Sequence, residues 1–391
     1  MLSIIWHGRL RGVRVVLACA VAGLLLIGLV SIGVTTSGAG FTQRHLVWIG
    51  LGLLVFVGVN VVPYRTWGRF SYLLYGLALG LLVFVLVGKH LGLHGFVEVK
   101  YGAARWIKLI PYHGSSPTVQ PSEVAKVAYI AALAWYLRQR RSYRTLGGLI
   151  GPFALALVPM ALIVLEPDLG TTLLFLPVLF AVLFAAGARL KHLVVVIGLG
   201  VVFMPVFYFF LMEDYQRTRV RVLLRQDSDD VEWLRGPGYQ LYKSKVSIGS
   251  GGLMGEGLGL DEESAEPPPF YYNDFIFAMI AHQWGFVGVV VLAFFFVLLL
   301  LSAIEIAAEQ PEPFGRLIAV GVAALLGAQA CVNMGMTMGL MPVTGMTLPF
   351  VSYGGSSMVV NFLALGLLFN VARHRSHRLT VRPFEFGRGG E

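Results

Sequence analysis

The strongest constraint on this chain is a series of apolar runs, each about 20 residues long, that recurs between residues 13 and 371. A helix needs about 20 consecutive apolar residues to cross the hydrocarbon core of a bilayer, which is about 30 Å thick. Charged residues make up 13% of the chain, whereas a soluble domain carries about 25%. The sequence therefore predicts an all-α membrane protein.

Ten transmembrane helices are predicted from these runs. They occupy residues 13–34, 45–63, 70–88, 123–137, 148–165, 169–187, 190–212, 274–302, 315–341 and 346–371. Two long polar interruptions, at 89–122 and 213–273, are predicted to be extracytoplasmic loops. Neither is large enough to fold separately, so residues 1–391 are predicted to form one membrane domain with a cytoplasmic tail at 372–391.

The formal net charge of the chain is +9. Basic residues in a membrane protein set its orientation more often than they bind nucleic acid, because short cytoplasmic loops are enriched in Lys and Arg. Here these residues concentrate in the loops and tails on the side of the two termini. Both termini are therefore predicted to lie in the cytoplasm. Membrane lipids are expected as partners, and nucleic acid is not.

Cysteine, histidine and glycine patterns argue against cofactor chemistry. Cys19 and Cys331 both lie inside apolar runs, and the nine histidines lack the spacing of a metal-binding motif. The glycine-rich stretch 249–259 lacks the Gly-Lys-Ser/Thr ending of a phosphate loop, so it is interpreted as a flexible outward turn. No metal site and no bound cofactor are predicted.

Ionisable residues near membrane depth are rare, and such residues are functional candidates. In the segment Gln120-Pro-Ser-Glu-Val-Ala-Lys126, the proline and serine indicate a helix start. Glu123 and Lys126 then lie on one face of the helix and can form an ion pair. This pair either neutralises two charges for structural reasons or binds a polar headgroup.

Three carboxylates lie at predicted helix ends. Glu166 and Asp168 fall in the turn between the fifth and sixth spans, where they are predicted to cap the next helix. Asp274 opens the eighth span directly after a proline-rich stretch. An isolated Asp at such a position is a helix cap more often than a catalyst. The residues alone leave both interpretations of Asp274 open.

The segment from Asn333 to Asn361 is unusually rich in Gly, Pro and Ser for a membrane region. Irregular backbone at that depth is tolerated only where protein or a water-filled cavity satisfies its polar groups. We therefore expect a wet central cavity beside this segment.

Six short sequence blocks follow one another along the chain. They are Gly102-Ala-Ala-Arg-Trp106, Gln120-Pro-Ser-Glu-Val-Ala-Lys126, Pro167-Asp-Leu-Gly-Thr171, Gly238-Tyr-Gln240 with Ser247-Ile-Gly-Ser-Gly-Gly-Leu253, Asp274-Phe-Ile-Phe277 and Leu348-Pro-Phe-Val-Ser-Tyr-Gly-Gly-Ser-Ser357. Over nearly its whole length the chain thereby resembles the SEDS family, the shape, elongation, division and sporulation proteins that include RodA and FtsW. Two further blocks, 214–220 and 244–252, are more similar to RodA than to FtsW.

The resemblance implies a peptidoglycan glycosyltransferase that polymerises lipid II into glycan strands during cell elongation. It also implies a multi-pass protein of the bacterial cytoplasmic membrane with an outward-facing site, beside a class B penicillin-binding protein that crosslinks the strands. An α-linked pyrophosphate donor becomes a β-1,4 glycan, so one displacement with inversion is expected. That reaction needs a base for the acceptor hydroxyl and positive charge near the pyrophosphate.

The same resemblance assigns Asp274 as the catalytic base and Lys126 or Arg105 as the source of positive charge. The other residues expected at the substrate site are Trp106, Lys108, Gln120, Ser122, Glu123, Asp168, Ser352, Tyr353 and Ser356. No protein metal ligand is implied, although a divalent cation, Mg²⁺ or Mn²⁺, could neutralise the pyrophosphate.

One departure from the family pattern surrounds Asp274. Family members typically carry Pro-Glu-x-His-Thr before this residue and a Glu-Glu pair after it. This chain has Pro269-Phe-Tyr-Tyr-Asn273 before it, and His282 and Gln283 after it. His282 lies about 80° around the helix from Asp274, so it is a poor replacement partner. The alternative functions are a flippase for a polyprenyl-linked precursor, a division polymerase of the FtsW type and an inactive scaffold.

Overall fold

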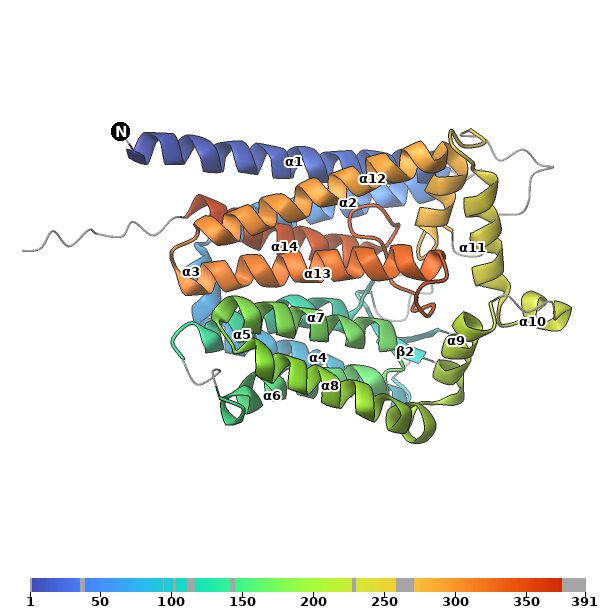
Figure 1. Ribbon diagram of the computed structural model, residues 1–391, viewed down its shortest axis with the longest axis horizontal. Coiled ribbons are helices and arrows are strands. Elements are labelled where there is room, and N and C mark those ends of the chain that lie inside the picture. Colours follow the sequence, from blue (N-terminus) through green and yellow to red (C-terminus); the bar gives the residue numbers. More distant parts are fainter. Residues whose placement is uncertain are drawn as a thin grey trace, which may run out of the picture.

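A computed structural model describes residues 2–35, 39–93, 95–100, 103–110, 117–140, 145–226, 230–257 and 271–374. The helices are α1 (Leu2–Thr35), α2 (Ala39–Val61), α3 (Tyr64–Arg69), α4 (Ser71–His90), α5 (Pro121–Leu137), the short turn η2 (Gly147–Leu149), α6 (Ile150–Leu165), α7 (Leu169–Ala186), α8 (Leu190–Val206), the wide turn η3 (Phe207–Leu211), α9 (Asp214–Leu224), α10 (Val231–Arg235), α11 (Tyr239–Ser250), α12 (Ile276–Glu309), α13 (Pro313–Thr337) and α14 (Gly355–Arg373). The strands are β1 (Val97–Lys100), β2 (Ala103–Lys108) and β3 (Thr118–Val119). The long helices form one bundle, with α9, α10, α11 and β2 at the end opposite the N-terminus (Figure 1).

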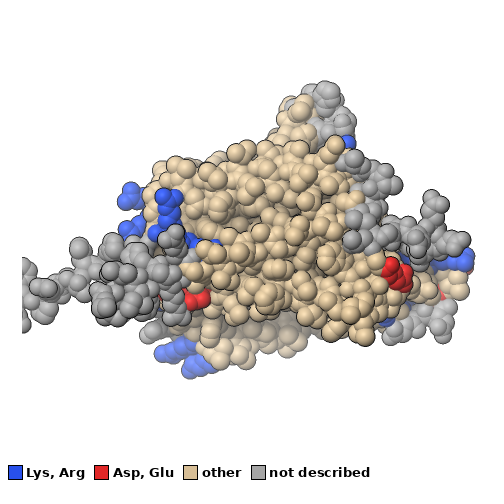
Figure 2. Space-filling model, turned by 90° about the horizontal axis from the view of Figure 1, so that it is seen from above, with Lys and Arg blue, Asp and Glu red and all other residues tan. Residues whose placement is uncertain are grey.

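The predicted all-α membrane class is confirmed. Within the described residues, nine helices are long and apolar enough to cross a membrane. The predicted span that is not among these nine is the fourth, at 123–137. It corresponds to α5, whose 17 residues reach about 26 Å. Nearly all residues of α5 are buried within the protein, so it is a central helix that neighbouring helices surround. Seen from above, a broad middle region shows no described charged side chains, and basic residues gather at one end (Figure 2).

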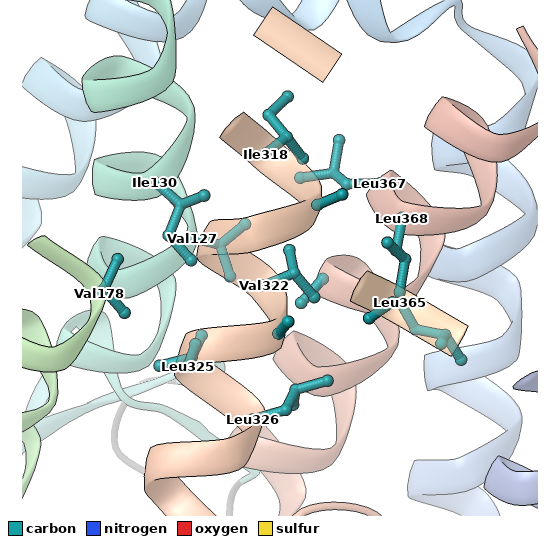
Figure 3. Packing of buried hydrophobic residues seen from close by; sticks show 14 of the residues in the cluster. Val127, Ile130, Val178, Ile318, Val322, Leu325, Leu326, Leu365, Leu367 and Leu368 are labelled. Atoms are coloured by element: carbon teal, nitrogen blue, oxygen red, sulfur yellow. The ribbon is translucent and has the colours of Figure 1, made fainter. Parts of the chain in front are cut away.

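Helix α13 forms the centre of the bundle, packed against α12, α7, α5 and α14. Its Ile318, Val322 and Leu325 point toward side chains of the neighbouring helices (Figure 3). Because lipid is as apolar as these side chains, close van der Waals packing rather than water exclusion holds such helices together. Gly321 permits the approach of α5, since a Cβ there would lie 2.6 Å from Ile130.

The first polar interruption folds into a small antiparallel sheet in the order β1-β2-β3. Val97 pairs with Ile107, which in turn pairs with Val119. Val97 and Ala104 are buried together with Val85 of α4, so the sheet sits on the end of the bundle. Part of the interruption 89–122, which was predicted to be a loop, is therefore strand, and alternate side chains of the sheet face the protein.

The second interruption, predicted as a loop, contains the three helices α9, α10 and α11. Glu213 and Gln216 form a reciprocal capping box at the start of α9. Hydropathy missed these helices because they are too polar and too short to span a membrane. The proline-rich stretch of the same interruption lies outside the described residues.

Two predicted spans were too long at their outer ends. Helix α13 ends at Thr337, not 341, and α14 begins at Gly355, not 346. The backbone at 338–354 is irregular, as its Gly, Pro and Ser content predicted, and Gly339 and Gly345 both have a φ of 77°. Glycine adopts such angles without the steric cost that a side chain imposes.

Candidate functional site

The position of Asp274 is fixed by the elements around it. The amide of Asn333, on α13, donates to the Asp274 carbonyl oxygen at 2.9 Å. The Ser352 hydroxyl donates to the neighbouring Asn273 carbonyl at 2.6 Å. Helix α12 begins after Phe275, which is its cap, so the interpretation of Asp274 as the helix cap is wrong. The Asp274 carboxyl therefore does not cap α12.

The Asp274 carboxyl is half-buried and lies close to other charged side chains. Burial raises the pKa of Asp274 to about 6, while Arg219 lowers it, Asp168 raises it and Arg105 lowers it. A Cβ on Gly345 would lie 3.3 Å from Asp274 Oδ2 and 3.8 Å from Arg219 Nη1. Only a bare backbone therefore fits comfortably between this carboxylate and this guanidinium.

Arg219 is the site residue that sequence analysis missed. It lies on α9, within the block 214–220 that resembles RodA, but neither spacing nor hydropathy links it to Asp274. Its Nη1 donates to the Val343 carbonyl, and its guanidinium lies 4.8 Å from the centre of the Tyr215 ring. The only sequence feature that marked Arg219 was its position in the block 214–220.

Asp168 has the predicted role of helix cap and a second role. Its carboxylate accepts from the Thr171 backbone nitrogen at 3.2 Å, which caps α7. Gln120, at the start of α5, donates to the same carboxylate at 2.9 Å. The Gln120 backbone nitrogen donates to Ser356 Oγ at 3.1 Å, and that hydroxyl donates to the Thr118 carbonyl. The outer ends of α5, α7 and α14 are thus joined at one point.

Arg105 binds the turn that holds two predicted carboxylates. From β2, its Nε donates to the Glu166 carbonyl at 2.9 Å, and Nη2 donates to the Pro167 carbonyl. The Glu166 side chain is buried, and burial raises its pKa to about 9, with Asp168 raising it further and Arg105 lowering it. Glu166 is therefore neutral near pH 7. The prediction that Glu166 caps α7 is wrong, because Asp168 is the cap.

Glu123 and Lys126 form the predicted ion pair on α5. Lys126 Nζ lies 2.8 Å from Glu123 Oε1, and the two side chains are 3% and 9% exposed respectively. Ser122, the preceding residue, is also buried. The ion pair is formed as predicted, and it neutralises two buried charges. A role of the pair in headgroup binding stays a prediction.

Other predicted residues lie on β2, at the end of the bundle opposite the N-terminus, and beside α14. Trp106 and Lys108 are on β2, where they pair with Glu98 and Thr118. The Tyr353 ring packs edge-on against the Tyr272 ring with a centroid distance of 6.0 Å. Substrate contacts by these side chains stay predictions.

His282 contacts neighbours other than Asp274. Its Nδ1 lies 2.8 Å from Ser250 Oγ, and its Nε2 lies 3.7 Å from Glu256 Oε2. These contacts fasten the end of α11 to α12. Among the described residues, no group of three or more His, Cys, Asp or Glu side chains could hold a metal ion.

Comparisons with known proteins agree on one family. The model of the cell cycle proteins FtsW, RodA and SpoVE matches residues 11–377. The peptidoglycan glycosyltransferase MrdB of Escherichia coli K12 is 35% identical over 337 residues, which cover 86% of each chain. The stage V sporulation protein E of Bacillus subtilis is 34% identical over 339 residues, covering 85% of this chain and 87% of that relative.

Solved structures give the same result. A chain of a peptidoglycan synthase complex, described as coordinating polymerization and crosslinking, superposes with a TM-score of 0.77 at 33% identity, covering 92% of this chain and 98% of that one. The rod shape determining protein RodA of Thermus thermophilus superposes with a TM-score of 0.67 at 31% identity, covering 92% and 96%.

Proposed function

The chain belongs to the FtsW, RodA and SpoVE family and is a peptidoglycan glycosyltransferase of cell elongation, and we propose that it polymerises lipid II with Asp274 as the base. The observation that carries this proposal is the Asp274 carboxyl itself. It is half-buried two residues before α12, its pKa is raised to about 6, and Arg219 lies close to it. A base with a pKa near the working pH is well matched to proton transfer.

The proposed reaction is a single displacement. The Asp274 carboxylate takes the proton of the acceptor sugar hydroxyl while that oxygen attacks the anomeric carbon of the donor. The bond from that carbon to the pyrophosphate oxygen breaks, and the lipid pyrophosphate leaves with the bonding electrons. The α linkage becomes β, and Asp274 then releases its proton to water.

Positive charge is also required where the pyrophosphate departs. Arg105 and Lys126 are the proposed sources, and both are already engaged, Arg105 with the Glu166 and Pro167 carbonyls and Lys126 with Glu123. We therefore propose that a divalent cation, Mg²⁺ or Mn²⁺, would bind mainly through the pyrophosphate of the substrate rather than through a protein cage.

The setting of the reaction follows from the same proposal. The protein is a multi-pass membrane protein, and we place it in the bacterial cytoplasmic membrane with the Asp274 end outward, where lipid II is consumed. A class B penicillin-binding protein is the proposed partner, which accords with the crosslinking named for the similar synthase complex.

A flippase remains the alternative from another functional class. It would require polar groups along a path across the bilayer, including the midplane. Here α9 and β2, which carry Arg219 and Arg105, lie at one end of the bundle (Figure 1), and both residues act electrostatically on Asp274. A polymerase therefore fits these positions better.

The test is glycan synthesis from labelled lipid II by purified protein, with and without the partner. Asp274→Asn should lower the polymerisation rate by about 10² to 10⁴, the usual contribution of a general base. Folding, measured as thermal stability, should persist, since Asn has nearly the same size. Asp214→Asn, an exposed carboxylate at the start of α9, is the matched control.

Three other results would contradict the proposal. Near-normal synthesis by Asp274→Asn would remove the base assignment. Synthesis by neither wild type nor variant, despite partner binding, would favour the inactive scaffold. Transport of lipid II across vesicles without synthesis would favour the flippase.

A further inference from the structure

A pocket of 170 Å³ lies outside the bundle, between α9, α11 and the irregular segment 338–354. Arg219 lines it together with the Thr218 hydroxyl, the Gln240 amide, the Tyr215 ring and the apolar side chains of Val222 and Val343. Both helices belong to the interruption 213–273, so these walls are made from protein beyond the membrane-spanning helices.

The pocket ends beside the proposed base. Arg219 is common to both, because its guanidinium lines the pocket and acts electrostatically on Asp274. Gly345 lies beside both Arg219 and Asp274, and it has no side chain that could separate the Asp274 carboxylate from the Arg219 guanidinium. Within the described chain, the buried Arg219 Nε has no hydrogen-bond partner. A buried donor of this kind usually has a partner, so the site accommodates a further acceptor.

The size of the pocket limits what can enter it. A volume of 170 Å³ holds roughly ten or more waters, since one water needs about 10 to 15 Å³ of such space. One sugar ring fits such a space, whereas a disaccharide with its peptide does not. The pocket can therefore bind one ring while the rest of a larger substrate lies outside it.

The chemistry of the walls favours a neutral ligand over a pyrophosphate. Among the described residues that line the pocket, Arg219 is the one cation, and the negative charge of Asp274 already opposes it. A pyrophosphate there would also meet the repulsion of that carboxylate. Gln240 instead offers a neutral donor and acceptor, and Tyr215 offers a ring face. The Thr218 hydroxyl donates to the Asp214 carbonyl at 2.8 Å and can still accept, so these groups together suit hydroxyl and acetamido groups.

We propose that this pocket binds one N-acetylated sugar ring at the reacting end of the lipid-linked substrate. This inference rests on the proposed glycosyltransferase reaction and adds a subsite to it. The ring would be held by Arg219, Thr218 and Gln240, with its reacting position toward Asp274. It belongs either to the acceptor, which presents the hydroxyl, or to the donor, which presents the anomeric carbon.

The kinetic test separates these two sources. A labelled lipid-linked disaccharide whose terminal 4-hydroxyl is blocked can serve only as donor, and an unlabelled, unblocked disaccharide without a pyrophosphate can serve only as acceptor. Gln240→Leu should raise the KM for one of them by about five- to tenfold, the usual effect of losing one or two hydrogen bonds. A rise for the unblocked substrate identifies an acceptor subsite, and a rise for the blocked one identifies a donor subsite.

Thr218→Phe, which fills the pocket from its rim, should produce the same change. Tyr242→Ala, an exposed side chain on α11, is the matched control and should leave both KM values unchanged. Unchanged KM values for both substrates in Gln240→Leu and Thr218→Phe, with normal thermal stability, would overturn the subsite.

A binding measurement separates this inference from the proposed reaction. Saturation-transfer NMR with soluble di-N-acetylchitobiose should detect binding to wild type and to Asp274→Asn, because chemistry is not needed. The signal should be lost in Thr218→Phe and kept in Tyr242→Ala. Binding by Asp274→Asn would support the subsite even if polymerisation failed, and equal binding by Thr218→Phe would overturn it even if polymerisation succeeded.

Discussion

At the scale of single residues, the two acidic groups near Arg105 behave differently. Glu166 is fully buried, and burial together with the repulsion of Asp168 outweighs the attraction of Arg105, so its pKa of about 9 keeps it neutral near pH 7. Asp274 faces Arg219, and its pKa of about 6 leaves it ionised there. The nearby positive charge therefore makes Asp274 the better base of the two.

The pH dependence of synthesis should report the ionisation of Asp274. A base acts only when deprotonated, so kcat/KM, which reports the substrate-free enzyme, should be constant above pH 7 and fall about tenfold per unit below about pH 6. Arg219→Gln removes a charge that lowers this pKa, so the inflection should move to higher pH. Arg221→Gln, exposed on the same helix, should not move it. An identical inflection in Arg219→Gln and wild type would contradict this account.

The ion pair of Glu123 and Lys126 gives a prediction about stability. Glu123→Lys or Lys126→Glu would leave two like charges buried on α5, and each should cost about 3 to 5 kcal/mol of stability and reduce synthesis. The double swap restores opposite charges and should recover part of both losses. Thermal unfolding and synthesis of the three variants measure this. If synthesis stays low while stability recovers, the charges also contact substrate.

At the scale of elements, α12 is a broken helix. Gly285 has a φ of 62° and a ψ of −159°, which frees backbone groups of the helix. The loop after α11 pairs with them, since Phe286 N donates to the Gly252 carbonyl at 2.9 Å and Glu256 N to the His282 carbonyl at 3.0 Å. Irregular backbone at this depth is tolerated because protein satisfies it. The break links α11, which lines the pocket, to the helix that follows Asp274.

Gly285→Ala should disrupt this link. The added Cβ would meet the Gly255 backbone nitrogen and would adopt a conformation that is nearly exclusive to glycine. We expect a loss of about 1 to 3 kcal/mol in stability and lower synthesis. The control is Gly249→Ala on α11, where a Cβ meets nothing within 4 Å. Equal melting temperatures for the two variants would show that the break tolerates a side chain.

At the scale of the whole molecule, the bundle has two different ends. The N-terminus lies at one end, and α9, α10, α11 and the sheet lie at the other (Figure 1). Basic side chains gather at one end of the space-filling view (Figure 2). If α5 crosses the membrane as a tenth span, both termini share one side and the Asp274 end faces the other.

This orientation predicts which residues an impermeant thiol reagent can reach. With Cys19 and Cys331 replaced by Ser, Glu232→Cys on α10 should be labelled in intact spheroplasts. Arg140→Cys, exposed just after α5, should be labelled only after lysis. The opposite pattern would reverse the topology and place the site in the cytoplasm.

Features that depend on neighbours along the chain could be predicted from the amino-acid sequence. Apolar runs gave the membrane helices, the spacing of Glu123 and Lys126 gave their ion pair, and Asp168 was correctly interpreted as a cap. Each depends on helical periodicity or on residues within one turn, which local composition specifies. The Gly, Pro and Ser content of 338–354 likewise predicted irregular backbone.

Only the tertiary structure decided which of these residues form a site. Arg105 and the Glu166 carbonyl are 61 residues apart in the chain, and Gln120 reaches Asp168 across 48. Arg219 approaches Asp274 only because α9 folds back over the end of the bundle. Such contacts carry no periodic signal, since they arise from the packing of separate elements. Whether Asp274 was a cap or a half-buried carboxyl beside a cation therefore depended on the fold.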